Sequence, residues 1–358
     1  MRWDLTPEQE LFRDSFAEWL AGRASTETVR RWLDSGDVTS FEQRMTADGW
    51  LGVGFSEDAG GQGGGLLELA LAAEQLGYAA APGATWLATV LAGPALASHP
   101  DVLAAVLEQG ESAALAVTAG QPPDEPGAVI VKDGGLHGTV RCVLGAGSAR
   151  HLIVPVWAGG GCTLFLARAE HPAISRAARK LLDRTRAAAD ITFTGTPAEP
   201  LDTDGPAVLA DAALRAAVLV AADSLGAADR MLRLAVDYSR QRTQFGSPIG
   251  SFQAVKHAAA TMLVGVESSR SVAYFAAASV DQGGPDSALP AAVAKAQVTA
   301  TAEQAADSAL TLHGAIGYSW EHDLQLFYKR AKLNTYLFGT PREWNERLAA
   351  GLPLVRSH

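Results

Sequence analysis

Apolar residues recur at helical spacing through the first third of the chain. The start signal Thr6-Pro7 precedes one such set, Leu11, Phe12, Phe16 and Leu20, and this pattern is typical of an amphipathic helix. The glycine-rich stretch GWLGVGFSEDAGGQGGG, residues 49–65, interrupts the pattern, which then resumes up to Pro82-Gly83. The stretch lacks the spacing of phosphate-binding loops, so we interpret it as a tight turn between helices. The pattern predicts a helical domain over residues 1–110.

The period changes to that of β-strands after residue 110. Short apolar runs such as AVIVK, HLIVPVW and CTLFLA are separated by Gly, Pro and Asp, which is typical of strands. The segment LHGTVRCV, residues 136–143, alternates apolar and polar positions, as a half-buried antiparallel strand does. No helix-length pattern separates most of these runs, which disfavours a parallel sheet with crossover helices. We predict a small antiparallel barrel or sandwich over residues 111–203.

Long helical patterns return over residues 204–358. One apolar stripe is formed by Leu214, Val218, Leu225, Leu232 and Val236, with charged residues on the other faces. We expect a second helix from Gln253, a third from Pro285-Asp286-Ser287 and a fourth from Glu321. Four such helices predict an antiparallel four-helix bundle. The chain is therefore expected to have an α+β fold, with a helical domain, a β domain and a helical bundle in that order.

Composition limits the possible partners. The 358 residues carry a net charge of −10, so the chain has no basic field with which to bind nucleic acid. The two cysteines, Cys142 and Cys162, have no metal-ligand spacing and cannot form a disulfide framework. The N-terminal segment is amphipathic and contains acids, unlike a signal peptide, and we expect no apolar run of membrane-spanning length. These features predict a cytoplasmic protein that binds neither nucleic acid nor membrane.

The stretch SRQRTQFGSPIGSFQAVKH, residues 239–257, concentrates unusual chemistry at the end of a predicted helix. Basic residues there complement the helix dipole, which suffices to explain Arg240. Arg242 is followed by Gln244 and Phe245. Arginine binds phosphate oxygens through a planar fork of donors, and a neighbouring aromatic and amide can hold a cofactor. The arrangement as a whole therefore indicates a cofactor-binding corner.

A second stretch, TLHGAIGYSWEHDLQLFYKRAK, spans residues 311–332. Gly314 and Gly317 permit close backbone approach to a ligand or to another helix. His313, Glu321, His322 and Asp323 are metal-ligating residue types. Because the three consecutive residues at the helix start point in different directions, however, we expect no metal site.

These two stretches, in this order, resemble the paired C-terminal signatures of the acyl-CoA dehydrogenase family. The segment of residues 49–77 is similar to the N-terminal domain of that family, so the resemblance covers most of the chain. It implies a helical domain, a β-barrel and a four-helix bundle, assembled as dimers or tetramers. The implied chemistry is FAD-dependent α,β-dehydrogenation of acyl-CoA thioesters, with electrons passed to electron-transfer flavoprotein.

The resemblance also implies roles for individual residues. Arg242 matches the arginine that reaches across a subunit interface to the FAD pyrophosphate, and Gly314-Ala315 matches a Gly-Gly turn that approaches the neighbour's cofactor. Three further positions match residues that line the FAD: Gln244, Phe245 and Gln253. Thr340 remains from a Glu-Gly-Thr segment and is a further candidate for contact with FAD.

The catalytic base of the family has no counterpart. The reaction requires a carboxylate that removes the α-proton of the thioester while the flavin accepts the β-hydride. The two positions at which the family places this Glu are occupied by Phe338 and Ala216. The β domain also lacks the family's flavin-contacting segments. Thr311 replaces a Gln, and Ala315 replaces a Gly.

Three hypotheses follow. In the first, the chain is a noncatalytic subunit of a heteromeric α₂β₂ acyl-CoA dehydrogenase: it completes an FAD site with Arg242, and a paralogous partner binds most of the acyl-CoA and supplies the base. In the second, it is a self-sufficient homomeric enzyme with a relocated base, for which the acids available are Glu57, Asp58, Glu321 and Asp323. In the third, it is a flavin-free structural or interaction protein of the same fold. We favour the first hypothesis.

Overall fold

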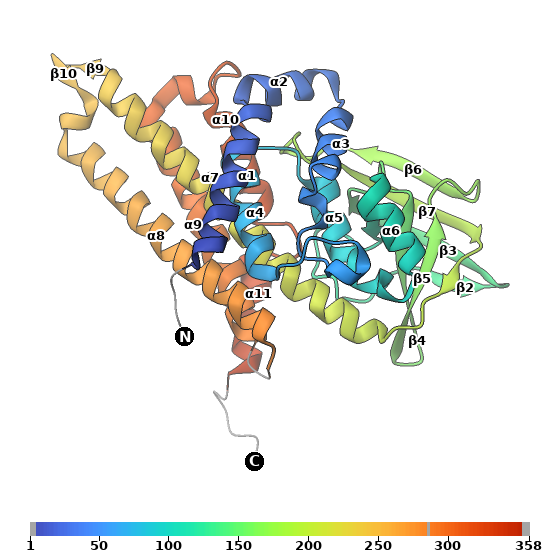
Figure 1. The fold of residues 1–358 in the computed structure, drawn as a ribbon. Coiled ribbons are helices and arrows are strands. Elements are labelled where there is room, and N and C mark those ends of the chain that lie inside the picture. Colours follow the sequence, from blue (N-terminus) through green and yellow to red (C-terminus); the bar gives the residue numbers. More distant parts are fainter. Residues whose placement is uncertain (1–4, 285–286, 353–358) are drawn as a thin grey trace.

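The computed structural model describes residues 5–284 and 287–352, which fold as three consecutive parts (Figure 1). The first part is helical, as predicted. Thr6 caps its first helix through a reciprocal capping box with Gln9, which satisfies backbone donors at the helix start. The helices of this part are α1 (Pro7–Arg23), α2 (Thr26–Ser35), α3 (Thr39–Ala47), α4 (Leu66–Ala79), α5 (Ala84–Ala92) and α6 (Pro100–Gln109), with short 3-10 turns η1 (Trp50–Gly52), η2 (Glu57–Ala59) and η3 (Gly93–Ser98).

The glycine-rich stretch folds back on itself before α4. Gly54 donates to the carbonyl of Gly63, and Gly63 donates to the carbonyl of Phe55. A Cβ atom on Gly61 would lie 2.2 Å from the carbonyl oxygen of Phe55, so only glycine fits at this close approach. The stretch is a tight turn between helices, as predicted.

The middle part consists of two separate four-stranded sheets, with strand orders β1-β4-β5-β8 and β2-β3-β7-β6. Of the two predicted arrangements, barrel or sandwich, the barrel is not formed, because no strand pairing joins the two sheets within the described residues. Apolar side chains of both sheets, such as Val154 of β4 and Phe193 of β7, instead share one buried cluster, as in a sandwich. The strands are β1 (Ala113–Leu115), β2 (Ile130–Lys132), β3 (Gly135–Leu144), β4 (His151–Ala158), β5 (Gly161–Arg168), β6 (Ile174–Arg179), β7 (Ala188–Thr196) and β8 (Glu199–Pro200).

Most strand pairs are antiparallel, as predicted, but β1 and β4 are parallel. A parallel pair needs a crossover connection. Here the chain passes through β2 and β3 of the other sheet before it returns as β4. This excursion between sheets is the reason that periodicity alone did not reveal the parallel pair.

The last part is a helical bundle built around α7 (Gly205–Gln241). It contains five helices in the described range, one more than predicted, and the predicted start of the third helix at Pro285-Asp286 lies outside that range. After α7 come the hairpin β9 (Thr243–Gln244) and β10 (Ser247–Pro248), then η4 (Ile249–Ser251), α8 (Gln253–Gln282), α9 (Ala288–His313), η5 (Gly314–Tyr318), α10 (Leu324–Asn334) and α11 (Pro341–Gly351).

By length and composition, α7 could cross a membrane, contrary to the expectation that no segment was long and apolar enough. However, 61% of its most apolar window is buried inside the protein. Figure 1 shows α7 running through the bundle towards the β part, with α8 and α9 beside it. The apolarity of α7 is accounted for by its position in the core.

A buried ionic network joins the three parts. Asp223 of α7 accepts two hydrogen bonds from Arg330 of α10, at 2.9 Å from Nε and 2.6 Å from Nη2. Arg186, between β6 and β7, lies 2.8 Å from the same carboxylate. Arg330 also donates to the carbonyl of Ala81, which follows α4. All three charged side chains are buried, so the network fixes the bundle against the other two parts.

Candidate functional site

The corner identified from the sequence is a two-residue hairpin that follows α7. Arg242 ends the helix, and its N–H donates to the carbonyl of Tyr238. The turn residues Phe245 and Gly246 both have positive φ, 53° and 78°, which is the geometry of a type I′ turn. The Phe245 side chain is 93% exposed, although it meets Phe252 edge to face at 6.2 Å. In Figure 1 the hairpin projects from one end of the bundle.

The polar side chains of this corner are largely free. Within the described residues the Arg242 guanidinium has neither an ion pair nor a hydrogen-bond partner, and it is exposed. Over residues 5–284 and 287–352, the Gln244 amide donates only to the carbonyl of Thr243. Gln253 begins α8 and is exposed as well. An arginine without a partner in the described structure keeps all its donors available for an anion.

Gly314 and Ala315 lie at the same end of the bundle as Arg242. The link is a ring stack: His313, the last residue of α9, stacks on Tyr238 of α7 at 4.7 Å and meets His322 at 4.7 Å. Tyr238 is one helical turn before Arg242, and His313 directly precedes Gly314. The structure therefore brings together the two sequence motifs. The stack itself was not predicted, because its members are far apart in the sequence.

Thr340 lies apart from this corner. It is the N-cap of α11, where its hydroxyl accepts from the N–H of Glu343 and contacts the Glu343 carboxylate at 2.9 Å. Figure 1 places α11 towards the opposite end of the bundle from the β9–β10 hairpin. A helix-capping role explains the presence of Thr340; its contact with FAD stays a prediction.

Phe338 and Ala216, at the two family positions of the base, are both sealed in the core. Phe338 is 2% exposed, and Ala216 is 0% exposed. The Phe338 N–H donates to the carbonyl of Ala119 at 2.6 Å, and its carbonyl accepts from Trp344 Nε1 at 2.8 Å. Neither side chain can accept a proton.

The acids considered for a relocated base lie on the surface or are engaged. Glu57 and Asp58 are exposed in η2, beside the glycine-rich turn. Glu321 is exposed, and Asp323 is held by Arg30 at 2.8 Å. Three of these carboxylates are exposed to water, and the fourth is already engaged by a cation, so none is prepared for proton abstraction.

A helical domain, two β-sheets and a helical bundle, in this order along the chain, define an acyl-CoA dehydrogenase fold. The C-terminal domain model of that family matches residues 203–349, and its N-terminal domain model matches residues 6–100. The chain belongs to the acyl-CoA dehydrogenase family of oxidoreductases, whose cofactor is FAD.

Particular members of the family are similar to this chain over most of its length. The chain is 33% identical to the acyl-CoA dehydrogenase IpdE2 of Mycolicibacterium smegmatis over 97% of this chain and 99% of that protein. It is 30% identical to the acyl-CoA dehydrogenase FadE34 of Mycobacterium tuberculosis over 97% of this chain but only 48% of that protein. Among solved structures, the Tcur3481-Tcur3483 steroid acyl-CoA dehydrogenase variant superimposes with a TM-score of 0.87 at 27% identity, covering 96% of this chain and 97% of that one.

The residues of the Arg242 corner suit an FAD site better than the residues around Phe338 do. The Arg242 corner offers unpaired donors and an exposed ring, which suit a phosphate and an aromatic cofactor. The region around Phe338 offers neither, because its backbone groups are already bonded and its side chain is buried. The Arg242 corner is therefore the region of this chain whose side-chain chemistry suits FAD.

Proposed function

We propose that this chain is a subunit of a heteromeric acyl-CoA dehydrogenase and completes an FAD site that lies mainly on a partner subunit. The observation that carries the proposal is Arg242: an exposed guanidinium without any partner among the described residues, beside a hairpin that presents Phe245 to solvent. Free donors on a projecting element are what a binding arm for a neighbour's phosphate requires.

Each residue of the corner has a role in this proposal. Arg242 binds the pyrophosphate of FAD as a planar fork, and Phe245 covers the cofactor and is itself buried by the partner. Gln244 and Gln253 line the cofactor, and the Gly314-Ala315 backbone approaches it closely. When bound, FAD supplies the hydride acceptor for α,β-dehydrogenation of the acyl-CoA. This chain contributes binding and orientation.

The partner in this proposal is a paralogous subunit that supplies the carboxylate base. The apolar, buried Phe338 and Ala216 leave this chain without a base at either family position. The similarity to the Tcur3481-Tcur3483 structure, whose name pairs two polypeptides, supports an assembly of unlike subunits such as α₂β₂. That name also supports a bulky, steroid-derived acyl group on CoA. Electron-transfer flavoprotein is the proposed electron acceptor, and the cytoplasm the proposed compartment.

The visible absorption spectrum tests this proposal. The chain is purified alone and, separately, after co-expression with a paralogue that retains the Glu base. We expect no flavin in the isolated chain, and flavin with acyl-CoA dehydrogenase activity in the complex. Stoichiometric flavin and activity in the isolated chain would instead support a self-sufficient homomer. A stable complex without flavin would favour a structural protein.

A further inference from the structure

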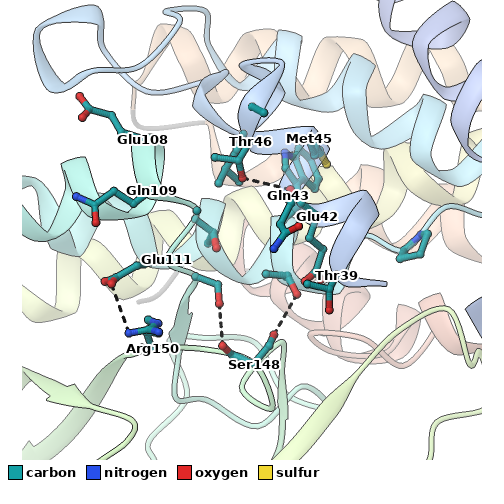
Figure 2. A pocket seen from close by; sticks show the side chains of 18 residues that line it. Thr39, Glu42, Gln43, Met45, Thr46, Glu108, Gln109, Glu111, Ser148 and Arg150 are labelled. Atoms are coloured by element: carbon teal, nitrogen blue, oxygen red, sulfur yellow. Dashed lines mark hydrogen bonds and ion pairs between the residues drawn. The ribbon is translucent and has the colours of Figure 1, made fainter. Parts of the chain in front are cut away.

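A cleft of about 640 Å³ lies between the helical part and the β part, away from the Arg242 corner. Figure 2 shows α3 residues such as Glu42 and Gln43 on one wall, and Glu108, Glu111 and Arg150 on the other. Its inner lining includes apolar side chains from several elements, namely Met45, Leu51, Pro82 and Trp86. A concave site of this size, with an apolar lining and a few polar groups, can hold a small organic ligand.

The charges that line the cleft favour a cation over an anion. Three carboxylates, of Glu42, Glu108 and Glu111, face it with one guanidinium, that of Arg150. Arg150 lies 3.6 Å from Glu111 and also 3.6 Å from Glu170, which leaves Glu42 and Glu108 as the lining carboxylates without a cation among the described residues. Within the described part of the chain no group of three acidic, histidine or cysteine residues could hold a metal ion. These features point to an organic cation.

Glu42 is the carboxylate best placed for such a ligand. It is half-buried and has no cationic partner in residues 5–284 and 287–352. Burial raises the pKa of its carboxyl, which the Thr85 hydroxyl opposes and Asp37 reinforces. A partly desolvated carboxylate without a cation gains from a ligand ammonium more than an exposed one does.

Trp86 contributes a second unsatisfied group, its indole N–H. It lines the cleft and is only 5% exposed, and its indole Nε1 finds no hydrogen-bond acceptor in the described structure. The Nε1 atom itself has almost no accessible surface, so a ligand oxygen reaches it only when the lining side chains move; a buried donor without a partner costs free energy that such a contact recovers. An aromatic side chain with an N–H also offers both an apolar surface and a directional contact.

We propose that this cleft binds a small organic amine with an apolar body and a hydroxyl or carbonyl oxygen. The ammonium pairs with Glu42, the oxygen accepts from Trp86 Nε1, and the apolar body packs on Met45 and Leu51. The cleft lies between α3 and the loop that carries Arg150, and none of the residues assigned to FAD lines it. The site is therefore separate from the proposed flavin function, and its test does not depend on flavin content.

Isothermal titration calorimetry on the full-length chain, in its complex with the partner subunit where the two co-purify, tests this site. The probe is phenylethanolamine. Styrene glycol lacks the ammonium, and phenethylamine lacks the hydroxyl. We expect phenylethanolamine to bind more tightly than either analogue. Absence of heat with phenylethanolamine at millimolar concentration, or equal affinity for styrene glycol, would overturn the proposal.

Three variants identify the contacts. Glu42→Gln should weaken phenylethanolamine binding about tenfold or more, because it removes a charge-assisted hydrogen bond. Glu108→Gln is the matched control, because Glu108 also lines the cleft but is exposed, and its effect should stay below about threefold. Trp86→Phe should reduce the affinity for phenylethanolamine to that for phenethylamine. Unchanged affinity in Glu42→Gln, with its melting temperature preserved, would contradict the assignment.

Discussion

The N–H of Phe338 donates to the carbonyl of Ala119 at 2.6 Å, which ties the loop before α11 directly to the segment after β1. The next residue, Gly339, also packs closely against this segment, because a Cβ atom there would lie 3.1 Å from Pro122. Lys295 of α9, itself buried, donates to the carbonyls of Asn334 and Gly339. The position at which the family places its base is therefore packed and bonded from three sides.

Restoring a carboxylate at this position should not restore catalysis. Phe338→Glu places an acid at a side chain that is 2% exposed and at a φ of 54°. We expect no dehydrogenase activity in the isolated variant, and a loss of unfolding free energy of about 3 kcal/mol or more, because the carboxyl is desolvated without a partner. The activity assay and urea denaturation measure the two effects. Phe338→Leu is the control and should cost about 1 kcal/mol. Turnover of an acyl-CoA by the isolated Glu variant would show that the flavin site of this chain is intact.

The exposed ring of Phe245 should contribute to subunit association. Phe245→Ala leaves the isolated fold unchanged, because the ring is 93% exposed. We expect it to weaken the complex with the paralogous subunit by about 2 kcal/mol, the typical effect of truncating an aromatic residue at the centre of an interface. Analytical ultracentrifugation at decreasing concentration measures the change. Leu182→Ala, at a side chain that is 53% exposed in the β part, should have little effect. Equal losses in both variants would place the interface elsewhere.

The buried network around Asp223 should make stability depend on pH at the acidic end. Burial alone would raise the pKa of Asp223, but Arg186 and Arg330 overcome burial and lower the pKa to about 2, from 3.8. Because the folded-state pKa is depressed, the unfolded state binds more protons as pH falls below about 4. The stabilisation, about 2 kcal/mol, is present at neutral pH and is lost towards pH 2.

Asp223→Asn tests this network. At pH 7 it should lower the unfolding free energy by about 3 kcal/mol, because it leaves buried guanidinium groups without their carboxylate. The difference from the unmodified chain should shrink as pH falls from 4 to 3. Asp237→Asn is the matched control, since Asp237 is exposed on the same helix. Urea denaturation at each pH measures the difference; a gap between the two proteins that is constant with pH would contradict the ionic account.

The spacing of apolar residues along the chain predicts most of the helices and turns, but it does not predict which distant strands pair. Helical spacing and glycine punctuation identified the helical domain, the bundle and the turn at residues 49–65. Barrel closure depends on which strand edges meet, and a period of two carries no information about edges. The partnership of β1 with β4 across the other sheet was hidden for the same reason.

In the candidate site too, features that are local in the sequence were predicted and contacts between distant segments were not. The motif around Arg242 was recognisable because hairpin, helix end and charge are local. The stacking of Tyr238 on His313 was not, because it joins two helices that are far apart in the sequence. The helix α11 did leave a signal: Thr340-Pro341, with Glu343 three residues after the threonine, is the pattern of a capping box. The resemblance to the family assigns Thr340 to the cofactor, and the sequence pattern read in that way does not predict the helix that Thr340 begins.

The flavin content of the complex with Arg242→Ala tests the central claim most directly. The variant and the Arg240→Ala control are each co-expressed with the paralogous subunit, and the bound FAD is measured by absorbance per complex. Both arginines are exposed near the end of α7. We predict a loss of about 1.5–3 kcal/mol in FAD binding for Arg242→Ala, roughly one to two decades in affinity, and no change for Arg240→Ala. Full flavin occupancy in the Arg242 variant, with the complex intact, would contradict the proposal that this chain lends its arginine to a neighbour's cofactor.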